Sequence, residues 1–210
     1  MSHIADINNW VQRGRYQKVV ELIDAALAEG ETAKSILEDG LLAAMSEVGE
    51  QFRQNKVFVT NVLLSARAMN MGIEHLKPHL VAGDVAERGV AVIGTVRGDM
   101  HDIGKNLVKM MLEGKGIRVI DLGVDTAPEA FVAAACENNA NIICCSALLT
   151  TTMGEMGEVV KAVRAEPKLA NCKIMIGGAP VNAEFCATIG ADFYTTDAAT
   201  AADVAVEICG

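Results

Sequence analysis

From Gly89 onward, short apolar runs alternate with segments of helical periodicity, and this alternation restricts the fold more than any other feature. Runs such as 90–93 have the length and β-branched content of strands that are buried on both faces. Strands are expected at 90–95, 118–121, 142–146, 173–176 and 193–195. Helices are expected at 106–115, 128–138, 154–165, 183–189 and 198–208. The pattern predicts an α/β domain over 89–210, with five parallel strands in a doubly wound sheet.

The first 80 residues carry no strand pattern and are predicted to be helical throughout. Apolar residues recur there at helical spacing, and caps and breakers mark the ends. Helices are expected around 7–11, at 16–29, after Thr32 as far as Phe52, and from about Thr60 to Pro78. We therefore expect a four-helix bundle over 1–85. The small and charged residues of 81–89 predict a linker that lets the two domains move.

Charge and hydropathy exclude several classes of partner. The formal net charge is −9, which would repel the phosphates of a nucleic acid. The longest apolar runs, such as 142–149, are too short to span a bilayer. Because the N-terminus lacks a basic region followed by an apolar stretch, no signal peptide is expected, and the cytoplasm is the predicted location.

The chain has 6 cysteines, and their spacing predicts neither a redox motif nor a zinc site. Cys144 and Cys145 are neighbours on a predicted strand, so they should face opposite sides of the sheet and not bridge each other. Reduced and mostly buried thiols are the expected state.

A histidine lies in the loop between the first predicted strand and its helix. His101 has Asp99 two residues before it and Gly104 three residues after it. An imidazole nitrogen is a good ligand for a transition metal, especially when a carboxylate accepts its other ring N–H. Gly104 lets the turn pass close to a bulky ligand. A histidine considered alone would more often be an ordinary surface histidine in a loop.

The loop lies where the predicted topology brings ligands. In a flavodoxin-like or Rossmann-like sheet, strands one and three flank the switch point at which ligands bind. Those strands end at the 99–104 loop and at Ser146. Topology and motif therefore select the same crevice.

Three short motifs at matched spacing resemble the cobalamin-binding pattern of methyltransferase corrinoid proteins and of methionine synthase. Asp-x-His-x-x-Gly covers 99–104, Ser-x-Leu begins at Ser146, and the paired glycines are Gly177 and Gly178. The gaps are 41 residues (105–145) and 28 residues (149–176), as in that family. The resemblance extends over nearly the whole chain.

The resemblance implies a cobalamin that is bound base-off, with His101 as the lower ligand of cobalt. It further implies that His101, Asp99 and Thr152 take part in catalysis as one hydrogen-bond chain. The residues that it assigns to cofactor binding are Asp99, Met100, His101, Asp102, Ile103, Gly104, Ser146, Leu148, Thr150, Thr152, Gly177 and Gly178. The segment 194–197 would close the slot for the nucleotide tail. Two alternatives stay open: Ser146 and Thr150 as caps of the next helix, and Gly177-Gly178 as a plain tight turn.

The helical half resembles the cap of methyl-carrying corrinoid proteins, over 45–52 and 63–69. Met45, Met69 and Met71 either shield the upper face of cobalt or belong to the core of the bundle. Many relatives have a Pro-Glu pair after an aromatic residue, where this chain has Phe58-Val59-Thr60-Asn61. The start of the cap is therefore expected to differ.

The resemblance implies a methyl carrier that is not catalytic alone. It would accept a methyl group on cob(I)alamin from a substrate:corrinoid methyltransferase, as methylcobalamin, and pass it to tetrahydrofolate or a thiol through a second, methylcorrinoid methyltransferase. A reductive activator would be a third partner. Methylamine, methanol, a methoxylated aromatic and a betaine all remain open as donors. The alternatives are a cobalamin-dependent sensor and the small subunit of an adenosylcobalamin mutase, and the helical cap disfavours both.

Overall fold

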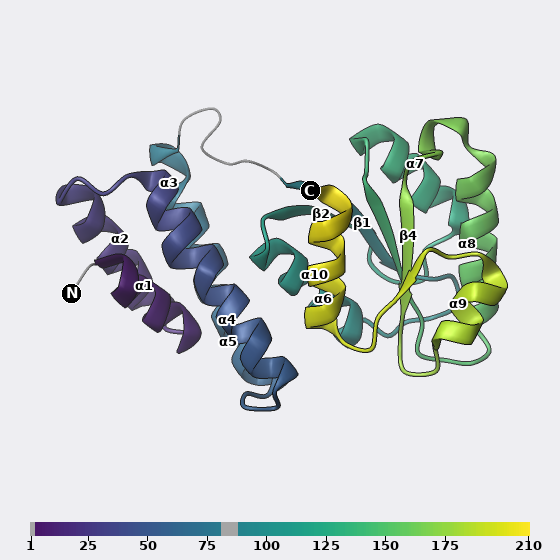
Figure 1. Cartoon of the computed structure of the whole chain (residues 1–210), viewed down its shortest axis with the longest axis horizontal. Coiled ribbons are helices and arrows are strands. Elements are labelled where there is room, and N and C mark those ends of the chain that lie inside the picture. Colours follow the sequence, from purple (N-terminus) through teal and green to yellow (C-terminus); the bar gives the residue numbers. More distant parts are fainter. Residues whose placement is uncertain (1–2, 81–87) are drawn as a thin grey trace. The chain divides into compact units, whose positions relative to one another are not determined.

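The computed structural model describes residues 3–80 and 88–210. The helices up to Leu80 form one compact unit, and nearly all of the chain from Arg88 onward forms a second (Figure 1). The linker expected at 81–89 lies outside the described residues except for its last two positions.

The first unit is helical, as the sequence predicted. Its elements are α1 (His3–Gln12), α2 (Tyr16–Ala28), α3 (Ala33–Ser35), η1 (Ile36–Leu42), α4 (Ala43–Arg53), α5 (Val59–Leu76) and η2 (Lys77–His79). Thr32 caps α3, because its side chain accepts a hydrogen bond from the backbone N–H of Ser35 at 3.1 Å. The helical run then continues to Arg53 through η1, a π-helix that apolar spacing did not predict.

Apolar side chains from all the long helices meet in the core of this unit. α1 contacts α2, α4 and α5, and α2 also contacts α5. Gly72 of α5 allows a close helix crossing, because a Cβ there would lie 2.9 Å from Leu41. Met45 and Met69 are buried in this core, whereas Met71 is 42% exposed. The interpretation of stripe methionines as core therefore applies to the first two.

The second unit is a five-stranded parallel sheet flanked by helices. Its strands are β1 (Gly89–Thr95), β2 (Ile117–Asp121), β3 (Ile142–Ser146), β4 (Lys173–Gly177) and β5 (Phe193–Tyr194). The order across the sheet is β2-β1-β3-β4-β5, and every described pairing is parallel. This is the predicted flavodoxin-like arrangement, in which β1 and β3 are neighbours although α6, β2 and α7 separate them in sequence.

Helices cover both faces of this sheet (Figure 1). They are α6 (Ile103–Gly114), α7 (Pro128–Asn138), α8 (Met153–Ala165), α9 (Ala183–Ile189) and α10 (Ala198–Cys209), with a short 3-10 turn, η3 (Pro167–Leu169). α6 begins three residues earlier than the expected 106–115 helix, so Ile103 and Gly104 form its first turn. The other helices of the sheet unit agree with the expected ranges to within one residue.

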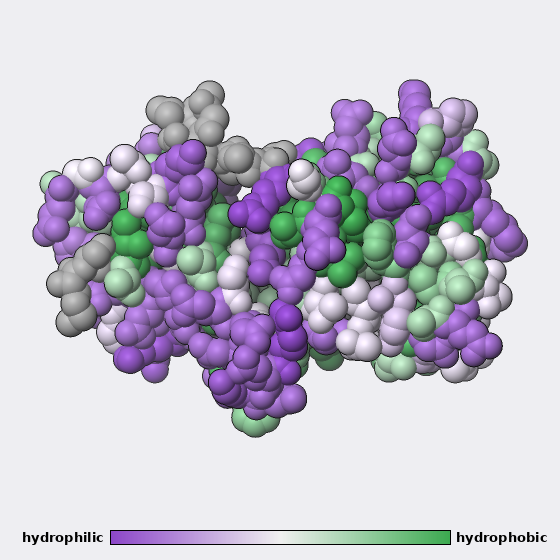
Figure 2. All heavy atoms as spheres, in the orientation of Figure 1, coloured by the Kyte–Doolittle hydropathy of each residue, from purple (hydrophilic) through white to green (hydrophobic). Residues whose placement is uncertain are grey.

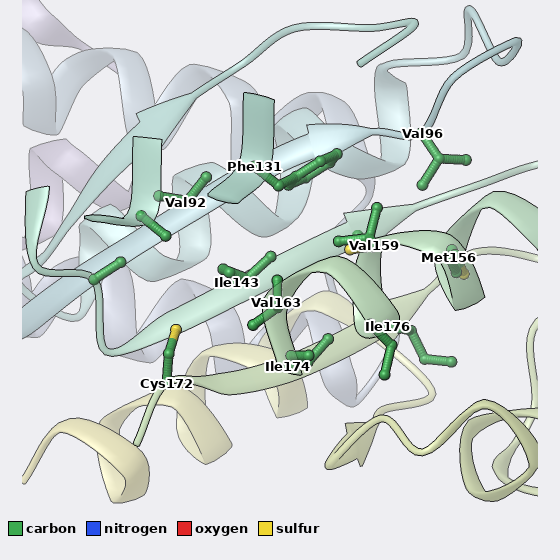
Figure 3. Packing of buried hydrophobic residues seen from close by; sticks show 14 of the residues in the cluster. Val92, Val96, Phe131, Ile143, Met156, Val159, Val163, Cys172, Ile174 and Ile176 are labelled. Atoms are coloured by element: carbon green, nitrogen blue, oxygen red, sulfur yellow. The ribbon is translucent and has the colours of Figure 1, made fainter. Parts of the chain in front are cut away.

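The main core of the sheet unit lies between one face of the sheet and α7, α8 and α9. Val92, Ile143 and Ile174 point from neighbouring strands into this cluster, where Phe131 and Val159 meet them (Figure 3). Each of these five side chains is fully buried. Burial of this kind stabilises a fold by roughly 25 cal/mol per Å² of apolar surface.

The cysteines are free, as expected, and four of the six are buried. Cys145 belongs to the core cluster, whereas its neighbour Cys144 does not, so the two thiols face opposite sides of the sheet. Figure 2 shows hydrophilic residues over most of the visible face of the helical unit, and more apolar residues at the surface of the sheet unit. None of the described helices is long and apolar enough to cross a membrane.

Candidate functional site

The loop that follows β1 is fixed by hydrogen bonds to its neighbours. The backbone N–H of Val96 donates to the carbonyl of Ser146, at the end of β3. The hydroxyl of Thr95 donates to the carbonyl of His101 at 2.8 Å. Because both strands end here in parallel, the loop comes to lie at the carboxyl edge of the sheet.

Asp99 is the buried centre of this loop, with no exposed surface. One carboxylate oxygen, Oδ2, accepts hydrogen bonds from Thr152 Oγ1 at 2.7 Å and from the backbone N–H groups of Leu148 at 2.8 Å and Leu149 at 3.2 Å. The other, Oδ1, accepts from the backbone N–H of His101 at 3.1 Å and is 2.8 Å from Nδ1 of the same residue. A single carboxylate thus joins the loop after β1 to the loop after β3.

These hydrogen bonds determine the charge of Asp99. Burial alone raises the pKa of its carboxyl, but the bonds from Leu148, His101 and Thr152 outweigh burial and bring the pKa well below its usual range. Asp99 is therefore a carboxylate at neutral pH, and it can only accept hydrogen bonds.

The tautomer of His101 follows from this charge. Because the carboxylate can only accept, Nδ1 of His101 carries the ring proton and donates a hydrogen bond to Asp99. In this neutral tautomer Nε2 keeps its lone pair. Nε2 has no hydrogen-bond partner in the part of the chain that the structure describes, and the side chain is 50% exposed. An oriented imidazole with a free Nε2 is the form in which histidine coordinates a metal.

Large apolar side chains are exposed on both sides of this histidine. Met100 is 68% exposed and Ile103 75%, and Leu148 and Leu149 of the neighbouring loop are each more than 40% exposed. Exposed apolar groups gathered at one place mark a binding surface. The residues around Nε2 therefore favour a large, largely apolar ligand.

A cavity of about 290 Å³ opens beside the loop, on the face of the sheet that α6 and α10 cover. Its lining includes Gly104, Ser146, Gly177 and Gly178 of the predicted set, together with the expected closing segment from Tyr194 to Asp197. The volume is near the lower end of the range of about 300–1,000 Å³ for small-molecule pockets.

The paired glycines differ in the space around them. A Cβ at Gly178 would lie 1.8 Å from the carbonyl oxygen of Ala147, and its φ is +138°, so the protein's own backbone requires glycine there. A Cβ at Gly177 would meet no atom within 4 Å. The open space at Gly177 belongs to the cavity, because Gly177 is one of its lining residues.

The remaining predicted residues lie at the rim of the site. Asp102 accepts a hydrogen bond from Asn106 Nδ2 at 3.0 Å, and Thr150 is exposed. The alternative that Ser146 and Thr150 cap the next helix is wrong, because α8 begins at Met153 with Thr152 at its N-cap position and without a side-chain cap.

The buried charge of Lys105, in the cavity wall, was not predicted from the sequence. Lys105 is 2% exposed, and its ammonium group bonds Asp121 Oδ1 at 2.7 Å and Asn106 Oδ1 at 2.7 Å. Lys109 shares the same carboxylate at 3.2 Å. Burial raises the pKa of Asp121, but the bonds from Lys105 and Gly123 outweigh it and lower the pKa. The available signal was spacing, since Lys105 lies three residues before the apolar Val108 on one helix face.

The donor set fits a metal that brings most of its own ligands. No group of three or more His, Cys, Asp or Glu side chains among the described residues is arranged to hold a metal ion. The site instead offers one imidazole nitrogen, exposed apolar side chains beside it, and an adjoining cavity with room at Gly177. These are the features needed by a metal-containing ring with a flexible side group.

Comparison with known proteins agrees with this geometry. Residues 89–207 match the family described as B12 binding domain, and residues 4–77 match a second family with the same description. Dimethylamine corrinoid protein 1 of Methanosarcina acetivorans is 42% identical over 192 residues, covering 88% of this chain and 90% of that protein.

Two solved structures resemble the whole chain. The methanol:cobalamin methyltransferase complex MtaBC from Methanosarcina barkeri gives a TM-score of 0.89 at 32% identity, covering 99% of this chain and 79% of that chain. A cobalamin-binding protein from Desulfitobacterium hafniense gives 0.80 at 30% identity, covering 99% and 98%. The chain therefore belongs to the B12-binding family of corrinoid proteins.

Proposed function

We propose that this protein is the methyl carrier of a corrinoid-dependent methyltransferase system. It would bind cobalamin, receive a methyl group from a substrate-specific methyltransferase, and deliver it to a second methyltransferase. The observation that supports this most is the Asp99–His101 pair, which leaves Nε2 of His101 without a partner among the described residues, on a loop whose Gly104 lines a cavity of the B12-binding domain. The sensor and mutase alternatives find no support in the names of two relatives described above, which refer to dimethylamine and to a methanol:cobalamin methyltransferase.

The bound cofactor would supply a cobalt centre that can accept and release a methyl group. The work of the protein is to hold and tune that centre. His101 would be the metal ligand, and Asp99 would keep the Nδ1 proton in place so that Nε2 stays available. Thr152 donates to the same carboxylate and would extend the chain over which a proton is shared.

The other predicted residues would contact the cofactor directly. Met100, Asp102, Ile103 and Gly104 would lie under the ring around His101, with Leu148 and Thr150 beside them. Ser146, Gly177 and Gly178 would hold the nucleotide tail in the cavity. This assignment is supported by the apolar exposure around His101 and by the open space at Gly177.

The two parts of the chain would divide the task. Residues 89–210 would bind the corrinoid, and residues 1–85 would form the cap over its methyl-carrying side. The partners would be a substrate:corrinoid methyltransferase, a methyltransferase that uses tetrahydrofolate or a thiol as acceptor, and a reductive activator. Because one relative is named for dimethylamine and another for methanol, the donor is expected to depend on the partner methyltransferase.

A labelled-methyl transfer experiment tests this proposal. The protein is loaded with cobalamin, reduced, and mixed with isotopically methyl-labelled dimethylamine or methanol and the corresponding methyltransferase. We expect label to remain on the protein until a methyltransferase with its acceptor is added. The His101→Ala variant should carry less label, because its cobalt lacks the lower ligand.

Adenosylcobalamin provides the contrasting measurement. A methyl carrier should bind methylcobalamin at least as tightly as adenosylcobalamin, whereas a mutase subunit should prefer the adenosyl form. Failure to take up label from any of these donors, together with a preference for adenosylcobalamin, would contradict the proposal.

A further inference from the structure

The strand register divides the cavity into two layers. On one side of the sheet, Ile93, Cys144 and Met175 pair across β1, β3 and β4 and line the cavity; we call them the slot floor. Two residues nearer the carboxyl edge, Ser146 and Gly177 pair across β3 and β4 and also line the cavity, and we call them the slot mouth. The residues just before the floor, such as Ile143, point into the opposite core (Figure 3).

The slot floor offers almost no hydrogen-bonding capacity. Two of its three side chains are aliphatic or thioether, and all three are at most 4% exposed. Cys144 contributes a thiol, a weak donor and acceptor. Burial raises the pKa of this thiol to about 12, so it stays uncharged.

The slot mouth, in contrast, has an available polar group. The hydroxyl of Ser146 makes no hydrogen bond within the described residues, although its carbonyl accepts one from Val96. The charged groups of the lining are already engaged: Lys105 bonds Asp121, and Asp197 accepts three bonds from Thr200 and Thr196.

Two further polar residues at the end of β5, Tyr194 and Thr195, do not add a hydrogen-bonding group to the floor. Tyr194 lines the cavity and also packs against the core cluster of the opposite face; it pairs with Ile176, one residue nearer the carboxyl edge than Met175 of the floor. Thr195 follows the last residue of β5, so it lies at the carboxyl edge with the mouth and away from the floor. A flat ring that entered the slot would therefore meet a hydroxyl at the mouth and apolar side chains at the floor.

We propose that this slot selects corrinoids whose lower base is a benzimidazole and discriminates against those whose base is a purine. The inference rests on the proposed function, because it assumes that the nucleotide tail enters the slot. A benzimidazole freed from cobalt has one ring nitrogen that needs a donor, which Ser146 can supply, and otherwise an apolar edge.

A purine such as adenine adds ring nitrogens and an amino group along that edge. Against Ile93, Cys144 and Met175 these groups would lose their water without gaining partners. An unpaired buried polar group costs enough to lower affinity about tenfold or more. The slot floor would thus act as a specificity filter for the cofactor.

Equilibrium binding of three corrinoids to the apoprotein tests this inference. The ligands are cobalamin, the analogue with adenine in place of dimethylbenzimidazole, and cobinamide, which lacks the nucleotide tail. Binding is followed by the visible spectrum and by competition. We expect cobalamin to bind at least about tenfold more tightly than the adenine analogue.

Two serine variants locate the effect. Cys144→Ser adds a better hydrogen-bonding group to the floor, so the ratio of cobalamin affinity to adenine-analogue affinity should fall by about threefold or more. Cys172→Ser makes the same chemical change at a buried cysteine of the opposite core, which does not line the cavity, and it should leave this ratio unchanged.

The outcomes separate this inference from the proposed function. Equal affinity for cobalamin and the adenine analogue would overturn the inference, and so would equal affinity for cobalamin and cobinamide. In both cases the protein would remain a corrinoid carrier. If none of the three corrinoids binds, the proposed function itself fails. The wild-type comparison decides the question even if a serine variant does not fold.

Discussion

Glycines on the two faces of the sheet have opposite surroundings. On the face covered by α7, α8 and α9, the space above Gly94 is filled by Phe131, whose ring would lie 2.8 Å from a Cβ there. On the face covered by α6 and α10, the space above Gly177 is open, with no atom within 4 Å of a Cβ. A glycine is therefore covered by a core side chain on one face and borders an open cavity on the other.

This difference arises within single strands, because alternate residues point to opposite faces. In β3, Ile143 belongs to the packed core, whereas Cys144 and Ser146 line the cavity. Under the proposed function, stability and cofactor binding thus depend on alternating residues of the same strand. Substitutions on the two faces should separate these two properties.

The largest effect on stability is expected on the packed face. Phe131→Ala should lower the free energy of unfolding by about 4 kcal/mol, because it leaves a large cavity in a fully buried cluster. Met175→Ala on the slot face should cost about 2 kcal/mol, because Met175 already borders an open cavity. Chemical denaturation of both variants measures the difference, and equal losses would contradict the contrast between the faces.

The paired glycines provide the next test. Gly178→Ala should lower the free energy of unfolding by about 3 kcal/mol, because the new methyl group collides with Ala147 and the backbone has a positive φ. Gly177→Ala should change stability by no more than about 0.5 kcal/mol.

Corrinoid binding should reveal the role of Gly177 instead. The methyl group of Gly177→Ala would occupy slot space, so we expect cobalamin affinity to fall about tenfold or more while cobinamide affinity changes little. A large loss of stability in Gly177→Ala, or unchanged cobalamin binding, would show that Gly177 does not serve the slot.

A smaller and pH-dependent effect is expected at Asp99. Asp99→Asn keeps the shape of the side chain but removes the charge that strengthens its hydrogen bonds. The substitution should lower the free energy of unfolding by about 2 kcal/mol at pH 7. Because the folded pKa of Asp99 lies below its ordinary value of 3.8, this advantage of the wild type is fully present above pH 3.8 and shrinks as the pH falls further.

Unfolding curves of wild type and Asp99→Asn between pH 7 and pH 3 measure this dependence. Asp102→Asn is the matched control, since Asp102 is an exposed carboxylate of the same loop. A difference between wild type and Asp99→Asn that grew on acidification would mean that the carboxyl is protonated in the native protein.

Much of this arrangement was predictable from sequence because it depends on local pattern. The buried run before the loop and the alternation after Gly89 predicted the sheet and its order, and Asp99 stands close enough in sequence to His101 for their contact to be expected. The bonds from Leu148 and Leu149 to Asp99 were not predicted, because they depend on how the loop after β3 is placed in space. Composition alone does not determine such a placement.

Residues whose role depends on register were also missed. Cys144 and Met175 form part of the slot floor because β3 and β4 pair in one register, and a shift of either strand by one residue would turn its own side chain toward the core. Lys105 was missed because a lysine on an apolar helix face is ordinarily expected to be solvated, whereas Asp121 and Asn106 pair with it here. The π-helix η1 likewise depends on packing within the bundle.

The visible spectrum of the protein reconstituted with methylcobalamin, for wild type, His101→Ala and the control His79→Ala, tests most directly whether His101 is the cobalt ligand. We expect a base-off, histidine-bound spectrum in wild type and in the His79 variant, and its loss in His101→Ala. If no corrinoid is retained, or if all three spectra are the same, His101 is not the ligand and the central claim is wrong.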